Sequence, residues 1–252
     1  MTRNLKLELA YDGTELHGWQ WQENAVSVQN VLSDAVFSVT AERPVIYGCG
    51  RTDAGVHAKG YVCSFTTESG VPTGKFVGAL NNYLPDSVVV RSCEEAPPEF
   101  NARYDVTSKT YRYAVYDSRV ADPFLRNRAY HHPGKLDAGL MARAAKEFEG
   151  EHDFTSFCAS HSVPGSKVRT VYSARVSEEG GLTVMDFTGS GFLYNMVRIM
   201  AGTLVEISEG RITDTVAQII EKRDRLCAGR TLPACGLYLM KVEYGDKKEI
   251  NS

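Results

Sequence analysis

The order of expected strands and helices constrains the fold of this chain more than any other feature. Alternating apolar residues predict half-buried strands, and apolar residues spaced three and four apart predict helices with one buried face. Ser27 is placed to cap the first helix, and Pro85 to stop the second. In the first half, these patterns predict strand 4–11, helix 28–39, strand 60–66, helix 76–84 and strand 87–93.

A similar order begins again after Pro97 and Pro98. Gly180 and Gly181 favour a hairpin between two of the later strands. We interpret both halves as β-α-β-β-α-β units, the second with one extra helix, which is the ferredoxin-like arrangement. The expected elements are strand 110–116, helix 137–150, strands 168–176 and 182–187, helices 192–207 and 214–227, and strand 237–244.

The expected fold class is therefore α+β, with two ferredoxin-like halves. Residues 1–105 form the first and residues 106–252 the second. Each half is expected to have an antiparallel sheet backed by helices, with an active-site cleft between the halves. Folds of this kind support many activities, RNA binding among them, so the function must be inferred from particular residues.

Composition and motifs exclude several classes of protein. The six cysteines include no Cys-x-x-Cys pair, and no His-Glu-x-x-His occurs, so we expect reduced thiols and no metal site. Phosphate-binding and dinucleotide-binding loops and the serine hydrolase elbow are also missing, which predicts no cofactor of these kinds. The sequence starts without the apolar run of a signal peptide, and no segment approaches a membrane span. These features predict a cytoplasmic protein with no membrane partner.

The net charge of −3 gives no overall signal for nucleic acid, so an RNA partner would need local basic patches. Residues 103–128 contain six basic and three acidic side chains. Residues 154–177 contain Lys167, Arg169 and Arg175 and no carboxylate. The alternative interpretation is that both stretches are ordinary solvated faces.

The glycine-rich stretch 48–58, Gly-Cys-Gly-Arg-Thr-Asp-Ala-Gly-Val-His-Ala, is the strongest candidate for a site. Its three glycines permit positive φ angles and close approach by another molecule. Asp53 is its only carboxylate, and Arg51 lies two residues away, where a bent loop can bring the two together. A nearby Arg favours the ionised carboxylate, which can act as a nucleophile or base. The alternative is a plain turn in which Thr52 and Asp53 bond local amides.

This eleven-residue string resembles the active-site signature of the tRNA pseudouridine synthase A family, in which the Asp at the position of Asp53 is catalytic. Some relatives have His where Asn195 stands, so no proton-transfer role is assigned to that position. Four more stretches resemble the family and, together with the first, span nearly the whole chain in the expected order: 101–113, 151–157, 191–198 and 233–239.

The resemblance also implies roles for other residues. Tyr111 would stack on the target uracil, contributing roughly 1–3 kcal/mol, and Arg51 would fill the space that the extruded base leaves. Tyr111 is also a candidate base at C5, but a phenol that ionises near about pH 10 makes stacking the safer role. Leu237 fits either a hydrophobic wall for the uracil or a plain core position. Arg198, on an apolar helix, needs a partner, which we expect to be Asp53, an RNA phosphate or a structural ion-pair partner.

The implied reaction converts uridine to pseudouridine at positions 38–40 in the anticodon stem-loop of tRNA. The N1–C1′ bond breaks, the uracil turns and a C5–C1′ bond forms, so no atoms are gained or lost and no cofactor is expected. Whether Asp53 attacks C1′, attacks C6 or removes the 2′ proton stays open. The resemblance further implies a homodimer whose two subunits contact one tRNA.

Two alternatives remain at this stage. One is a pseudouridine synthase that acts on another RNA, and the substrate would distinguish it. The other is a non-catalytic RNA-binding module, which would gain nothing from the Asp53 carboxylate near phosphates.

Overall fold

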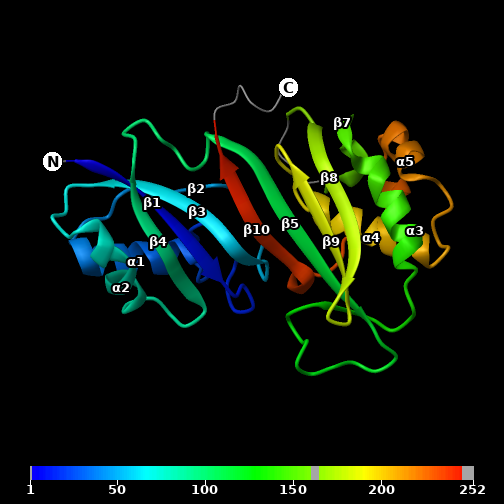
Figure 1. The fold of residues 1–252 in the computed structure, drawn as a ribbon, viewed down its shortest axis with the longest axis horizontal. Helices are drawn as coiled ribbons and strands as arrows, with labels where there is room; N and C mark the ends of the chain where they lie inside the picture. The colour runs from blue at the N-terminus through cyan, green and yellow to red at the C-terminus, as the bar shows by residue number, and fades with distance from the viewer. Residues whose placement is uncertain (1, 160–164, 246–252) are drawn as a thin grey trace. The chain divides into compact units, whose positions relative to one another are not determined.

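The computed structural model describes residues 2–159 and 165–245. The chain forms two compact units, Met1–Thr107 with Tyr238–Ser252, and Ser108–Leu237. Helices and mostly antiparallel strands occur in both, which confirms the expected α+β class (Figure 1). The final strand, expected with the second half, groups with the first unit, and the domain division at residue 105 stays a prediction. Within the described ranges, no helix is both long and apolar enough to cross a membrane.

The sheet of the first unit is built around its N-terminal strand. Strand β1 pairs antiparallel with β3 on one side and with β4 on the other, and β2 pairs antiparallel with β3. The last strand, β10, runs parallel to the start of β3. The bounds are β1 Arg3–Tyr11, β2 Tyr47–Gly48, β3 His57–Thr67, β4 Val88–Ala96 and β10 Leu237–Tyr244.

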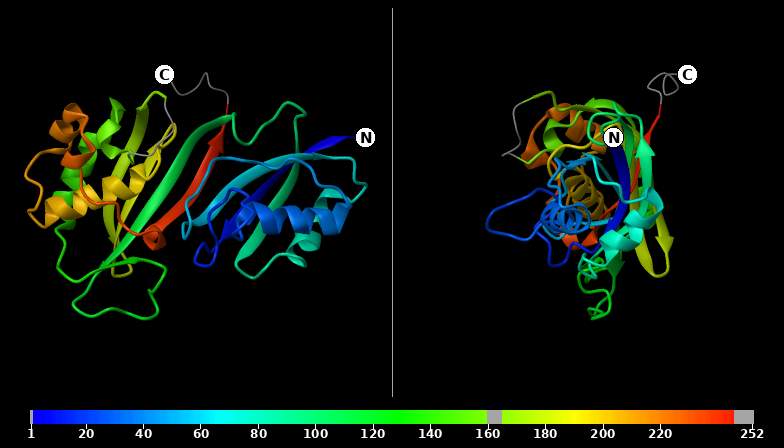
Figure 2. Two further views of the ribbon diagram at one scale, coloured as in Figure 1. Left: turned by 180° about the vertical axis from the view of Figure 1, so that it is seen from behind. Right: turned by 90° about the vertical axis from the view of Figure 1, so that its left-hand side faces the viewer.

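Helices α1, Val28–Thr40, and α2, Thr73–Asn81, pack against the first unit's sheet (Figures 1 and 2). Leu5, Leu7 and Leu9 of β1 are fully buried because they point to the face that the helices cover. The predicted cap at Ser27 is confirmed: its side chain accepts the N–H of Asn30, and the Asn30 side chain accepts the N–H of Ser27.

In the second unit, antiparallel strands pair in the order β5-β9-β8-β7, and β6 pairs in parallel with the end of β5. The predicted hairpin is confirmed: Gly180 and Gly181 join β8 to β9 with φ angles of 58° and 81°. The strand bounds are β5 Val106–Asp117, β6 Tyr130–His132, β7 Gly150–Asp153, β8 Val168–Glu179 and β9 Leu182–Gly189.

Helices α3, α4 and α5 and several short 3₁₀ turns complete the second unit. Their apolar faces are buried, with Met141 of α3, Leu204 of α4 and Ile219 of α5 fully covered. The helices are α3 Ala138–Ala145, α4 Met196–Ser208 and α5 Val216–Lys222, and the 3₁₀ turns are η1 Lys146–Phe148, η2 Thr155–Phe157, η3 Arg225–Cys227 and η4 Ala234–Gly236.

Both later helices are shorter than the sequence predicts. Helix α4 begins at Met196 instead of residue 192 because Asn195 adopts the left-handed conformation, with φ 60°. Asn tolerates that conformation better than most residues. Helix α5 ends at Lys222, where Arg223 is left-handed with φ 49°, and the expected remainder is the separate turn η3. Apolar spacing continues across both breaks, so periodicity alone did not reveal them.

Candidate active site

Asp53 and Arg51 lie on the turn that joins β2 to β3 in the first unit. Arg51 is exposed, Asp53 is partly buried, and Thr52 between them is buried. The carbonyl of Asp53 accepts the N–H of Val56 at 3.2 Å, and Gly55 closes the turn with φ 79°. The carboxylate therefore extends from a tight, internally bonded turn. Pairing of Arg51 with Asp53 stays a prediction.

The segment 13–19 lies directly against this turn. The N–H of Trp19 donates to the carbonyl of Thr52 at 3.2 Å, and the N–H of Gly55 donates to the carbonyl of Leu16 at 3.1 Å. A Cβ added at Gly13 would lie 2.1 Å from the carbonyl oxygen of Val56. A Cβ added at Gly18, where φ is 78°, would lie 2.2 Å from the carbonyl oxygen of Thr52. Only glycine permits an approach this close.

Sequence reasoning missed this segment: it placed the end of a strand at Gly13 and assigned nothing to residues 14–19. The available signal was the pair Gly13 and Gly18, since glycines in a polar loop can mark a close approach of two backbones. Nothing local to either glycine, however, indicates which distant loop it meets.

Aromatic residues fix the start of the turn. The phenol of Tyr61 donates a 2.6 Å hydrogen bond to the carbonyl of Gly50, and the ring of Trp19 stacks on the Tyr61 ring at 4.2 Å. Burial raises the pKa of Tyr61 well above its ordinary value, so its phenol stays protonated and remains a donor. A Cβ at Gly48 would lie 2.1 Å from the Tyr61 oxygen.

Three further predicted site residues belong to the second unit. Tyr111 lies on β5, paired with Phe187 of β9, and is 9% exposed. Its ring meets the Phe192 ring edge to face at 5.4 Å and 86°. Leu237, at the end of the unit, is also buried. Both residues are therefore largely packed by protein.

Arg198 of α4 fixes the chain that leads to Leu237. Its Nε donates to the carbonyl of Leu232 and its Nη1 to the side-chain oxygen of Asn195, both at 2.7 Å. One residue further along, the carbonyl of Pro233 accepts the phenol of Tyr113 at 2.6 Å. The segment before Leu237 is thus tied to both α4 and β5. Further roles for Arg198, toward Asp53 or an RNA phosphate, stay predictions.

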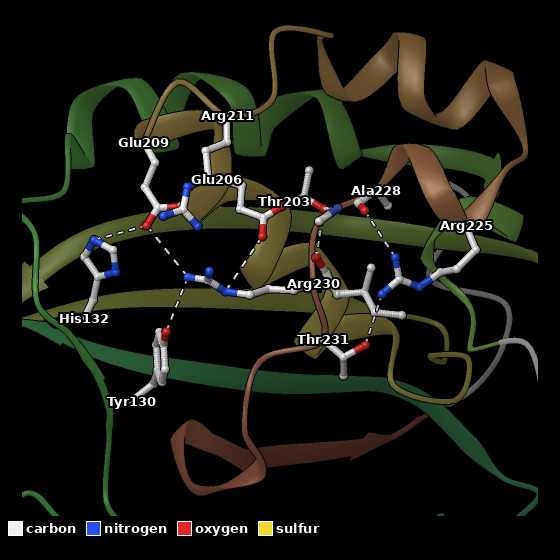
Figure 3. A network of polar contacts seen from close by, with 12 residues as sticks. Tyr130, His132, Thr203, Glu206, Glu209, Arg211, Arg225, Ala228, Arg230 and Thr231 are labelled. Atoms are coloured by element: carbon white, nitrogen blue, oxygen red, sulfur yellow. Dashed lines mark hydrogen bonds and ion pairs between the residues drawn. The ribbon is translucent and has the colours of Figure 1, made fainter.

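Arg225 and Arg230 make further polar contacts in the segment that follows α5, and Arg230 joins this segment to α4 (Figure 3). Arg225 donates to the carbonyl of Ala228 and to the Thr231 hydroxyl at 3.2 and 3.1 Å. Arg230 lies 3.7 Å from a carboxylate oxygen of Glu206. The N–H of Gly229 donates to the Thr203 hydroxyl, and the carboxylate of Glu209 lies within 4 Å of both Arg230 and His132. Sequence reasoning missed this network, because its members come from separate elements.

The basic stretches are only partly available to an RNA. Arg112 binds Asp186 through two hydrogen bonds of 2.8 and 2.7 Å, and it also donates to Glu179. These carboxylates neutralise Arg112, which the sequence suggested as one of the residues that bind RNA phosphates. Arg119 and Arg126, by contrast, are exposed. Residues 160–164 of the second stretch lie outside the described residues. In the ranges that the structure covers, no three His, Cys, Asp or Glu side chains gather as metal ligands would.

Comparison with known proteins identifies the class. The family model described as tRNA pseudouridine synthase matches residues 9–105 and 144–245. The chain is 46% identical over 243 residues to tRNA pseudouridine synthase A of Acetivibrio thermocellus, covering 96% of this chain and 100% of the relative. The chain is 45% identical to the tRNA pseudouridine synthase A of Clostridium acetobutylicum and 46% identical to that of Pelobacter propionicus. Each match covers 96% of this chain and 100% of the relative.

The chain therefore belongs to the tRNA pseudouridine synthase family. This membership confirms the resemblance seen in the sequence. It also confirms the predicted class of enzyme, an isomerase that converts uridine in tRNA to pseudouridine.

Proposed function

We propose that this enzyme isomerises uridines at positions 38–40 in the anticodon stem-loop of tRNA, with Asp53 as the catalytic carboxylate. The observation that carries the proposal is the turn of Asp53, which backbone and side-chain hydrogen bonds from segment 13–19 and Tyr61 hold in one conformation. A fixed carboxylate suits attack on the sugar or base, or removal of a proton, because correct placement supplies much of the rate.

Arg51 acts beside Asp53 in this proposal. It lies on the same turn with an exposed side chain, so it can reach an incoming nucleic acid. Its guanidinium would occupy the space that the extruded base leaves.

Tyr111, Arg198 and Leu237 form the proposed substrate-binding group. Phe192 covers the Tyr111 ring from one side and so limits its rotation, which suits a ring that stacks on uracil. Leu237 follows a segment attached at Leu232 and Pro233, and a fixed apolar side chain suits the wall of a base pocket. Arg198 contributes one of those attachments.

The assembly and fold complete the proposal. We propose two ferredoxin-like halves, residues 1–105 and 106–252. The strand neighbours β4-β1-β3-β2 in the first unit, with helices between β1 and β2 and between β3 and β4, support this for the first half. The enzyme would act as a homodimer that contacts one tRNA with both subunits. A cytoplasmic location fits a tRNA substrate.

Tritium release from tRNA labelled at uracil C5 tests the function, because the C5 hydrogen leaves when the C5–C1′ bond forms. The parent should release tritium and Asp53→Asn should release none while still binding tRNA. Transcripts with single labelled uridines at positions 38, 39 and 40 assign the site. Release only from uridines elsewhere would refute the anticodon assignment, and full activity of Asp53→Asn would refute the role of Asp53.

A further inference from the structure

The residue before Asp53 is held through its side chain as well as its backbone. The hydroxyl of Thr52 lies 2.9 Å from the phenol oxygen of Tyr11, which ends strand β1, 41 residues away in the sequence. Both side chains are buried, at 8% and 4% exposure, so their hydrogen bond does not compete with bulk water. The carbonyl of Thr52 is fixed separately by the N–H of Trp19. Because both groups are held, the peptide that leads into Asp53 has little freedom to rotate.

The other end of the turn is fixed by His57, the first residue of β3. Its side chain is buried, and its ring stacks on that of Tyr238 at 4.7 Å and 22°. Its Nδ1 accepts the N–H of Gly13 at 3.1 Å. Oδ1 of Asp12 lies 3.1 Å from the same nitrogen. The direction of the Gly13 N–H is set by the backbone, so its contact with Nδ1 fixes the place of Gly13 relative to the His57 ring. Asp12 Oδ1 in turn accepts hydrogen bonds from Thr14.

Gly13 also lies directly against the end of the turn. A Cβ there would overlap the carbonyl oxygen of Val56, the neighbour of His57. The Gly13–His57 hydrogen bond therefore holds the segment where it touches the end of the turn, and Tyr11 holds the residue before the carboxylate. The two contacts lie on either side of Asp53 and come from the same stretch of chain, residues 11–13.

We propose, building on the role proposed for Asp53, that Tyr11 and His57 are positioning residues for its carboxylate. Neither acts on the substrate. Tyr11 fixes the Thr52 side chain, and His57 fixes segment 13–19 against the turn, so that Asp53 meets the uridine in one geometry. Displacing a reacting group by about 1 Å can lower a rate by about 10²-fold. Losing either contact should therefore lower kcat and leave tRNA binding intact.

The Tyr11→Phe variant tests the first contact because it removes one oxygen and keeps the ring that packs at 5.7 Å from Tyr61. We expect kcat to fall at least about 10-fold, with KM and the Kd for tRNA within about 2-fold of the parent. The matched control is Tyr244→Phe, which also removes one phenol oxygen in the first unit. That phenol is part-buried and donates to the carbonyl of Ala102 at 2.8 Å. Its kcat should stay within about 2-fold of the parent at temperatures where both variants are folded.

A double-mutant cycle with Thr52→Val shows whether Tyr11 acts through Thr52. If it does, Tyr11→Phe, Thr52→Val and the double variant should lose similar factors in kcat, because all three remove the same hydrogen bond. For His57, the Asn variant keeps an acceptor oxygen near the position of Nδ1 and the Ala variant does not. We expect His57→Asn to retain several-fold more kcat than His57→Ala, again with tRNA binding unchanged.

The positioning role is overturned if Tyr11→Phe keeps the parental kcat, or if Tyr244→Phe loses as much as Tyr11→Phe. It is also overturned if the losses of Tyr11→Phe and Thr52→Val multiply, or if the His57 variants act on Kd alone. Tritium release by the parent is measured in the same assay. If the parent is active and Asp53→Asn is inactive, the proposed function stands even when the positioning role fails. If Asp53→Asn is active, both the role of Asp53 and the positioning role are refuted.

Discussion

The phenol of Tyr113 donates a 2.6 Å hydrogen bond to the carbonyl of Pro233, joining strand β5 to the segment that ends at Leu237. Burial raises the pKa of Tyr113 well above its ordinary value, so the phenol remains a donor across the usable pH range. A Cβ at Gly236 would lie 2.7 Å from the carbonyl oxygen of Ala114, which shows how closely this segment lies on β5.

Tyr113→Phe should therefore lower the free energy of unfolding by about 0.5–1.5 kcal/mol, because it removes a part-buried hydrogen bond between β5 and the segment before Leu237. Urea unfolding measures the loss. Tyr172→Phe is the control: Tyr172 is 40% exposed, and its change should stay within about 0.5 kcal/mol. Equal changes in the two variants would mean that the hydrogen bond to Pro233 contributes nothing.

Gly18→Ala should inactivate or unfold the enzyme. The new Cβ would lie 2.2 Å from the Thr52 carbonyl oxygen, and the φ of 78° disfavours any residue with a side chain. The comparison is Gly78→Ala in α2, where no atom lies within 4 Å of the new Cβ. That variant should gain about 0.5–1 kcal/mol of stability because alanine favours a helix. Thermal unfolding and tritium release measure both effects, and a fully active Gly18→Ala enzyme would show that the turn tolerates displacement.

Arg126 and Arg112 should differ in how they affect the salt dependence of tRNA binding. Each phosphate contact adds about 0.7–0.9 to the slope of log K against log salt. Arg126 is exposed, so Arg126→Gln should reduce the slope by about that amount if it contacts phosphate. Arg112 is engaged by Asp186 and Glu179, so Arg112→Gln should leave the slope unchanged and lower stability instead. The reverse pattern would place Arg112 at the RNA surface.

His132 should make the enzyme less stable in mild acid. Burial lowers the pKa of His132 below its ordinary value of 6.5, with Arg230 and Arg211 acting in the same direction and Glu209 and Asp117 opposing them. The unfolded chain therefore binds the proton more readily than the folded one. The contribution of neutral His132 to stability is complete above pH 6.5. It is lost as the pH falls from 6.5 toward the pKa of His132 in the folded protein.

Replacing His132 by Gln should make the decline in stability below pH 6.5 less steep, as measured by urea unfolding on both sides of that pH. His17 is exposed, so His17→Gln is the control and should leave the slope as it is in the parent. A parental slope in His132→Gln would show that other groups cause the decline.

Local interactions explain which elements the sequence predicted well. The cap at Ser27 depends on Asn30, three residues away, and the hairpin at Gly180 and Gly181 depends on φ angles that glycine permits. The burial of Leu5, Leu7 and Leu9 follows from the two-residue period of a strand. Helix α4 was predicted too long because the left-handed Asn195 interrupts an unbroken apolar pattern.

The sequence by itself determined the longer strands and the helices in order, the glycine-rich turn with Asp53, and the family, since each depends on residues close together in the chain. It did not reveal the short strands β2, β6 and β7. Only the tertiary structure decided what holds that turn. The Thr52 side chain is hydrogen-bonded to Tyr11, 41 residues away. In the second unit, Arg198 is likewise hydrogen-bonded to the carbonyl of Leu232, 34 residues away. Which distant groups meet depends on how the sheets and helices pack, because packing brings together donors and acceptors that no local pattern relates.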